Sequence, residues 1–164
     1  VQDFVPIDEL PQGVRQTSLG FTSGYMDVAP VPAHPFGFGL TYGRFEYSAP
    51  RLSTSTLSPE GELRVEATIT NNGTRAATET VQLYVRDIAG SVTRPVRELK
   101  GYERVTLAPG ESRVVSFTIR TGALAFTGLD MQRAAEPGAF QVWVAPDAQS
   151  GEAATFELTE RLAR

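Results

Sequence analysis

The residues that could act as nucleophiles or as general acids and bases are few in this sequence. The 164 residues include one histidine, His34, and no cysteine. This excludes thiolate nucleophiles, disulfide bonds and zinc sites that need Cys or two imidazoles. His34 lies between Ala33 and Pro35, and its neighbours offer no Ser and Asp in the arrangement that a catalytic triad requires. We interpret His34 as a surface residue.

Carboxylates are numerous but are not grouped along the chain. There are 19 Asp and Glu residues, yet no Asp-x-Asp run and no calcium-loop pattern occurs among them. A hydrolytic site with two carboxylates, or a metal site, needs such groups to be brought together. We therefore expect the carboxylates to lie on the surface or in turns, and we assign no catalytic, metal-binding or cofactor-binding residue to this chain.

A glycine-rich segment at residues 37–43 partly matches a dinucleotide-binding fingerprint. Tyr42 stands where that fingerprint needs its third glycine, and the segment leads into a predicted strand rather than into a helix. We favour a structural role, in which the glycines permit close backbone approach to a neighbour. The large side chains of Phe36, Phe38 and Tyr42 would then anchor the segment at a joint between domains.

The segment Asn71-Asn72-Gly73-Thr74 has two interpretations. Asn72-Gly73-Thr74 matches the acceptor motif for N-glycosylation. Asn and Gly also tolerate positive φ, so the same residues are typical of a hairpin turn between two strands. We favour the turn, because such short acceptor motifs are frequent by chance.

Tyr84 and Trp143 lie at strand positions whose alternation directs their side chains away from the core. Gln82, Arg86 and Gln141 flank them on the same face. Exposed aromatic rings beside polar groups could stack on a sugar or seat a protein partner. Alternatively, other parts of a larger protein cover this face, and we favour that second interpretation.

Charge and hydropathy narrow the classes of partner. The formal net charge is −4 and the isoelectric point is about 5.1, so a nucleic-acid partner, which needs a basic patch, is not expected. No run approaches the roughly 18 apolar residues of a membrane span.

The elements that must position these residues are short strands. From Phe45 onward, apolar and polar residues alternate in runs separated by Gly, Pro and Asn turns, which predicts an all-β, immunoglobulin-like or fibronectin type III-like β-sandwich of about seven strands. Residues 122–126 fit one short helical turn. We expect Leu83 and Phe117 to face the core, so that their truncation costs more stability than truncation of Tyr84 or Gln82.

The first 40 residues differ from the rest. They are rich in Pro and Gly and show no sustained period, yet they carry about ten apolar side chains, too many for a solvated tail. We predict that another part of a larger protein covers them, and that the sandwich folds without them.

Two blocks of sequence resemble a known family. Residues 35–48, PFGFGLTYGRFEYS, are similar to the signature that precedes the C-terminal fibronectin type III-like domain in glycoside hydrolase family 3. Residues 80–87, 94–105, 107–111 and 136–144 are similar to that domain in order and spacing. The resemblance implies the end of the family's second, α/β sandwich catalytic domain plus a linker at residues 1–41, and the fibronectin type III-like domain at residues 42–164.

The resemblance also implies a function for the longer protein. Family 3 enzymes such as β-glucosidases and β-xylosidases remove terminal sugars with retention, using carboxylates that lie upstream of the region matched here. This chain would then be structural and inactive alone, with the catalytic domains of the parent as its partners and a glycoside substrate reached only through them. The alternative is a free-standing β-sandwich that binds carbohydrate or protein through the face of Tyr84 and Trp143.

Overall fold

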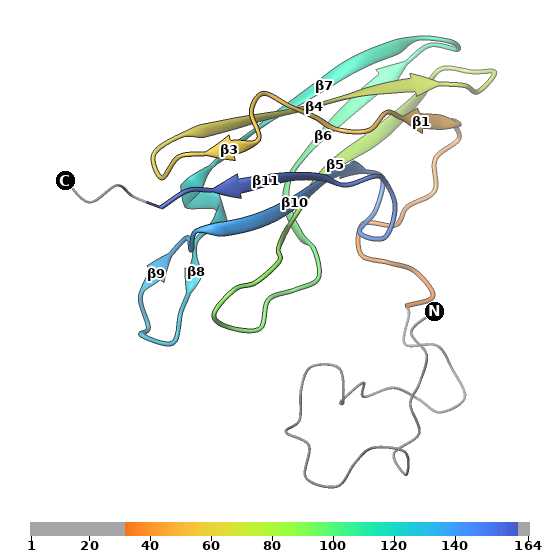
Figure 1. The fold of residues 1–164 in the computed structure, drawn as a ribbon. Helices are drawn as coiled ribbons and strands as arrows, with labels where there is room; N and C mark the ends of the chain where they lie inside the picture. The colour runs from red at the N-terminus through yellow and green to blue at the C-terminus, as the bar shows by residue number, and fades with distance from the viewer. Residues whose placement is uncertain (1–31, 161–164) are drawn as a thin grey trace, which may run out of the picture. The chain divides into compact units, whose positions relative to one another are not determined.

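The structure is a computed structural model that describes residues 32–160 (Figure 1). The predictions for residues 1–31, including most of the expected end of a catalytic domain, lie outside the described residues. His34 and the residues after it belong to the same unit as the strands.

Two sheets form the fold (Figure 1). The four-stranded sheet contains β1 (Phe45–Tyr47), β2 (Arg51–Leu52), β4 (Glu62–Asn71) and β7 (Ser112–Arg120). The five-stranded sheet has the order β3 (Thr56–Leu57), β11 (Ala154–Leu158), β10 (Gly138–Ala145), β5 (Ala77–Asp87) and β6 (Glu98–Leu107). The expected all-β sandwich is confirmed.

Shorter elements complete the chain. A 3-10 helix, η2 (Thr121–Leu124), lies where one short helical turn was predicted. It leads into a small hairpin of β8 (Phe126–Thr127) and β9 (Arg133–Ala134). Between Phe45 and Leu52 the chain forms two short strands, β1 and β2, and Pro50, which has no backbone N–H for a ladder, lies in the gap.

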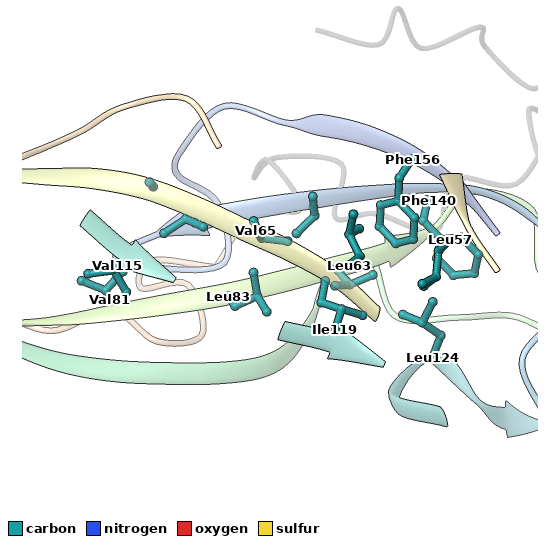
Figure 2. Close-up of a cluster of buried hydrophobic side chains, with 14 of the residues drawn as sticks. Leu57, Leu63, Val65, Val81, Leu83, Val115, Ile119, Leu124, Phe140 and Phe156 are labelled. Carbon is teal, nitrogen blue, oxygen red and sulfur yellow. The ribbon is translucent and has the colours of Figure 1, made fainter. Parts of the chain in front are cut away.

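The core lies between the two sheets, and the period-two alternation selects its members. Leu63, Val65 and Ile69 of β4 are fully buried, as is Val81 of β5. Figure 2 shows buried side chains from both sheets pointing toward one another, and the Phe140 and Phe156 rings stack with centroids 5.4 Å apart. Phe117 packs against this core but is only partly buried.

The turn at residues 71–74 is present but does not form the predicted hairpin. β4 pairs with β1, β2 and β7, whereas β5 pairs with β6 and β10, so this connection crosses from one sheet to the other. Asn71 is fully buried at the crossing. Its Nδ2 donates to the carbonyl oxygens of Arg75 and Leu107, at 2.9 Å each, and its Oδ1 accepts from the Gly73 N–H at 2.9 Å.

Candidate functional site

The face of the five-stranded sheet that points away from the core carries a second buried cluster. Its members are Tyr84, Trp143 and Ala145, with Ala148 packed against them. Tyr84 of β5 lies opposite Trp143 of β10 in the antiparallel register. The prediction that both point away from the core is confirmed. Tyr84 is 0% exposed and Trp143 is 5% exposed, so the face is covered, as favoured, but residues of this chain cover it rather than another part of a larger protein. In this structure neither ring is free to stack on a sugar.

Residues 34–42, here called the strap, cover part of this face. The Phe36 carbonyl oxygen accepts from the Ala148 N–H at 2.9 Å. The Gly37 carbonyl oxygen accepts from Gln82 Nε2 at 3.1 Å, and Thr41 Oγ1 donates to the Thr78 carbonyl oxygen at 3.2 Å. The strap therefore runs along β5 and is attached to it at more than one point.

Gln82, held by Tyr84, links the strap to the loop that follows β10. The Tyr84 hydroxyl donates to Gln82 Oε1 at 2.6 Å, and Gln82 Nε2 also donates to the Pro146 carbonyl oxygen. Burial raises the pKa of the Tyr84 hydroxyl. Gly37 has φ +82°, and a Cβ at this position would overlap Gln82 Oε1 and the Tyr84 hydroxyl. Only glycine fits here without displacing those groups.

The Trp143 ring is covered from another direction by Arg97. The guanidinium carbon of Arg97 lies 4.0 Å from the ring centroid, and Arg97 Nη1 donates to the Ser150 carbonyl oxygen at 2.8 Å. Asp147 shapes the same loop by accepting from the backbone N–H groups of Gln149 and Ser150, at 2.8 Å each. The strap, this loop and Arg97 together exclude solvent from the sheet face.

The outer side of the strap is apolar and exposed. Phe36 is 68% exposed, Phe38 46%, Leu40 92% and Tyr42 95%. Tyr102 of β6, which pairs with Gln82 in the sheet, is 68% exposed beside them. We call these five residues the strap surface. Such a concentration of large apolar side chains on a pinned segment is typical of a docking surface.

Catalytic groups do not gather at this site. Within residues 32–160 there is no group of three or more His, Asp or Glu that could hold a metal ion. We also find there no helix with the length and apolar character that crossing a membrane requires. His34 is exposed, as predicted, and its ring stacks on Phe38 with centroids 4.7 Å apart. The exposed apolar side chains of the strap surface therefore suit binding to the apolar surface of another protein segment.

The comparisons with known proteins agree with this geometry. A family model described as "Fibronectin type III-like domain" matches residues 79–148. A periplasmic β-glucosidase of Salmonella typhimurium is 41% identical over 138 residues, covering 84% of this chain and 18% of the relative. A β-xylosidase of Formosa agariphila is 38% identical over 129 residues, covering 79% and 18%.

A solved structure of a β-glucosidase from Listeria innocua in complex with glucose superposes with a TM-score of 0.80. It is 31% identical, over 93% of this chain and 22% of the solved one. The chain belongs to glycoside hydrolase family 3. It corresponds to the C-terminal, fibronectin type III-like region of these enzymes, and it spans about a fifth of the length of the relatives it matches.

Coverage of the sheet face was expected, but from other parts of a larger protein rather than from residues of this chain. In the family 3 chain, alternation reports only which side of a strand a residue occupies, so it cannot show which segment covers Gln82 and Tyr84. The signal for coverage was Gly37 within the Pro-Phe-Gly segment, a position that permits the close approach now seen. The roles of Phe36, Phe38 and Tyr42 as joint anchors stay a prediction, consistent with their exposure here.

One carboxylate outside the strap is buried. Glu79 of β5 is 8% exposed, which corrects the expectation that the carboxylates lie on the surface or in turns. It accepts a hydrogen bond of 2.8 Å from the Tyr47 hydroxyl. Burial raises the pKa of Glu79 above its usual 4.5, although the hydrogen bond from Tyr47 partly opposes this, and burial also raises the pKa of Tyr47.

We expect Glu79→Gln to change the pH profile of stability. Because the folded pKa of Glu79 is raised, its favourable contribution is complete below about pH 4.5 and is lost as pH rises through the folded pKa. Relative to the variant, the wild type should lose stability in that window, with a slope of at most about 1.4 kcal/mol per pH unit. Urea denaturation between pH 4 and 8 measures it.

Glu111→Gln is the matched control for this profile. Hydrogen bonds from the Ala108 N–H and Arg113 lower the pKa of Glu111. Its contribution is therefore present above pH 4.5 and falls as the solution becomes more acidic, which is the opposite sign. Identical profiles for the two variants would show that Glu79 is not the group responsible.

Proposed function

We propose that this chain is the C-terminal structural part of a retaining, exo-acting glycoside hydrolase that acts on β-glucosides or β-xylosides, and that it stabilises the catalytic domains. The observation that carries the proposal is the strap surface, a row of exposed large apolar side chains on a segment that the sandwich itself holds in place. The names of the relatives support the substrate class.

Energetics favour an occupant on the strap surface. Each large apolar side chain that leaves water contributes roughly 1.5–3 kcal/mol. Leu40 and Tyr42, which are 92% and 95% exposed, contribute almost none of this to the folding of the chain alone. The inner side of the strap, by contrast, is fixed by the hydrogen bonds to Gln82, Ala148 and Thr78. A pinned, preformed surface binds without the cost of ordering a loose segment.

Docking of the strap surface on the catalytic domains is tested in the full-length glycosidase with the double variant Phe36→Ser, Tyr42→Ser. In the isolated chain these changes should alter the free energy of unfolding little, because both side chains are largely exposed. In the full-length enzyme they should weaken docking by about 3 kcal/mol or more and lower the Tm. Differential scanning calorimetry of both proteins measures the effect.

Val114→Ser is the matched control for the joint. Val114 is 58% exposed on β7 of the other sheet, away from the strap. It should leave the Tm of the full-length enzyme unchanged. An equal fall in Tm for the control and the strap variant would remove the support for this docking surface.

The isolated chain is expected to show no turnover of aryl β-glucosides or β-xylosides. A retaining mechanism needs two carboxylates about 5 Å apart, and we assign no such pair to this chain. The assay compares the pure chain with buffer alone. Turnover that disappears when one carboxylate of this chain is replaced by its amide would show that the chain carries chemistry of its own.

A further inference from the structure

The loop of the β8–β9 hairpin has a conformation that its sequence does not favour. Thr127 pairs with Arg133, and the Gly128 N–H donates to the Gln132 carbonyl oxygen at 3.0 Å. Three residues remain in the loop, and the last of them, Met131, has φ +61°. Hairpin loops of this length place a left-handed residue at this position, where Gly is favoured.

Met131 does not favour the stability of the isolated chain, for two reasons. Among the described residues other than glycine, it alone has positive φ, a conformation that a long side chain rarely adopts. Its side chain is also 79% exposed, and that of Leu129 in the same loop is 82% exposed. The isolated fold thus gains little from either side chain, and departures of this kind concentrate at functional sites.

A neighbouring loop, residues 88–97, also carries exposed apolar side chains. The Ser91 N–H donates to Glu136 Oε2 at 2.9 Å, and the Arg94 guanidinium lies 4.3 Å from the centroid of the Phe126 ring. These contacts tie the loop to the hairpin. Its exposed apolar side chains are Ile88, 46% exposed, and Val96, 72% exposed. We call Ile88, Val96, Leu129 and Met131 the hairpin-end surface.

The loop that carries part of the hairpin-end surface reaches the same sheet face as the strap. Arg97, which ends the 88–97 loop, covers Trp143 on the same sheet face that the strap covers. In the view of Figure 1, the strap, the β5–β6 loop and the β8–β9 hairpin all project below the five-stranded sheet. The backbone segments that carry the two surfaces therefore project to the same side in this view.

We propose that the hairpin-end surface is a second docking surface for the catalytic body of the parent glycosidase, with Leu129 and Met131 as its anchors. This inference rests on the proposed function. Two observations identify the partner. The relatives are about five times longer than this chain, so most of the parent lies outside it. The proposed strap contact would place that remaining part on the side of the sandwich where the hairpin-end surface also lies. Two separated contacts would constrain the orientation of the sandwich more than the strap surface does alone.

Oxidation by hydrogen peroxide tests whether the catalytic part of the parent enzyme covers Met131, without an activity measurement. Peroxide converts an exposed Met thioether to the sulfoxide, and mass spectrometry of the peptide that contains Met131 gives the rate. We expect Met131 in the full-length enzyme to be oxidised at least tenfold more slowly than in the isolated chain. Equal rates would overturn the inference. Slower oxidation of the isolated chain at higher protein concentration would identify a second copy as the occupant and would also overturn it.

Met131→Gly provides a second test with opposite signs in the two proteins. Glycine relieves the left-handed conformation, so the Tm of the isolated chain should stay the same or rise. The Tm of the full-length enzyme should fall, because an anchor is lost. A fall in the isolated chain, or no change in the full-length enzyme, would contradict the inference.

The strap variants separate the two proposals. If Phe36→Ser with Tyr42→Ser lowers the Tm of the full-length enzyme while Met131 stays unprotected, the proposed function stands and the hairpin-end inference fails. If neither surface responds, both fail together.

Discussion

Tyr84→Ala should lower the free energy of unfolding by about 3–5 kcal/mol, in the range expected when a buried aromatic side chain is removed. Tyr84 is 0% exposed, and its hydroxyl donates to Gln82 Oε1 at 2.6 Å. Leu83→Ala, on the core face, should cost a comparable 2–5 kcal/mol or so. Urea denaturation of the isolated chain measures both.

This expectation corrects the ranking drawn from the strand pattern. That ranking made Tyr84 the cheaper residue to truncate, as on a sheet with one open face. All five residues from Val81 to Val85 are at most 6% exposed, so β5 is covered on both faces. The register itself is right, because Leu83 joins the core and Tyr84 the opposite cluster.

Tyr102→Ala is the matched control for Tyr84→Ala. Tyr102 is on the adjacent strand and pairs with Gln82, but it is 68% exposed, so its loss should cost about 0.5 kcal/mol or less. If the two variants lose equal stability, the strap does not cover Tyr84 in solution.

Asn71→Ala is the second substitution with a large expected effect, roughly 3 kcal/mol or more. It leaves the Gly73 N–H and the carbonyl oxygens of Arg75 and Leu107 without the partners that Asn71 supplies. A buried polar group left unsatisfied costs about 1–3 kcal/mol. Chemical denaturation of the isolated chain gives the value.

Asn72→Ala is the control at the neighbouring position. The Asn72 side chain is exposed and donates to Glu46 Oε2 at 2.6 Å, so the expected loss is about 1 kcal/mol or less. A larger loss for Asn72 than for Asn71 would mean that the crossing between sheets is held by the exposed amide.

Local patterns were sufficient to predict the strands and their faces. Alternation in β4, for example, places Leu63, Val65 and Ile69 in the core because successive side chains point to opposite sides of a strand. The same rule correctly separated Leu83 from Tyr84. These properties depend on residues close together in sequence.

Properties set by distant residues were not predictable in this way. Turn chemistry at residues 71–74 is the same whether the next strand pairs with the last one or crosses to another sheet, so a hairpin was expected where a crossing occurs. Likewise, alternation cannot show that residues 36–41 cover Gln82 and Tyr84, more than 40 positions later. The expectation that the sandwich folds without residues 1–40 is therefore limited to residues 1–33, because removing the strap would expose the buried cluster of Tyr84 and Trp143.

The family was identified from motifs rather than from composition. The Pro-Phe-Gly segment at residues 35–48 carries the resemblance, and the contacts of Gly37 supply a physical reason for its glycine. The domain boundary at residues 41 and 42 stays a prediction. The hydrogen bonds of the strap attach residues 35–41 to the sandwich, on the face of the five-stranded sheet that points away from the core.

The central claim is that this chain stabilises a glycosidase without supplying chemistry, and kcat/KM per folded molecule tests it most directly. The measurement compares the full-length enzyme with its Phe36→Ser, Tyr42→Ser variant across temperature, with the folded fraction followed by circular dichroism. We predict equal kcat/KM wherever both proteins are fully folded, and a loss in the variant that tracks its earlier unfolding. A reduced kcat/KM in the variant at temperatures where it is fully folded would contradict the account.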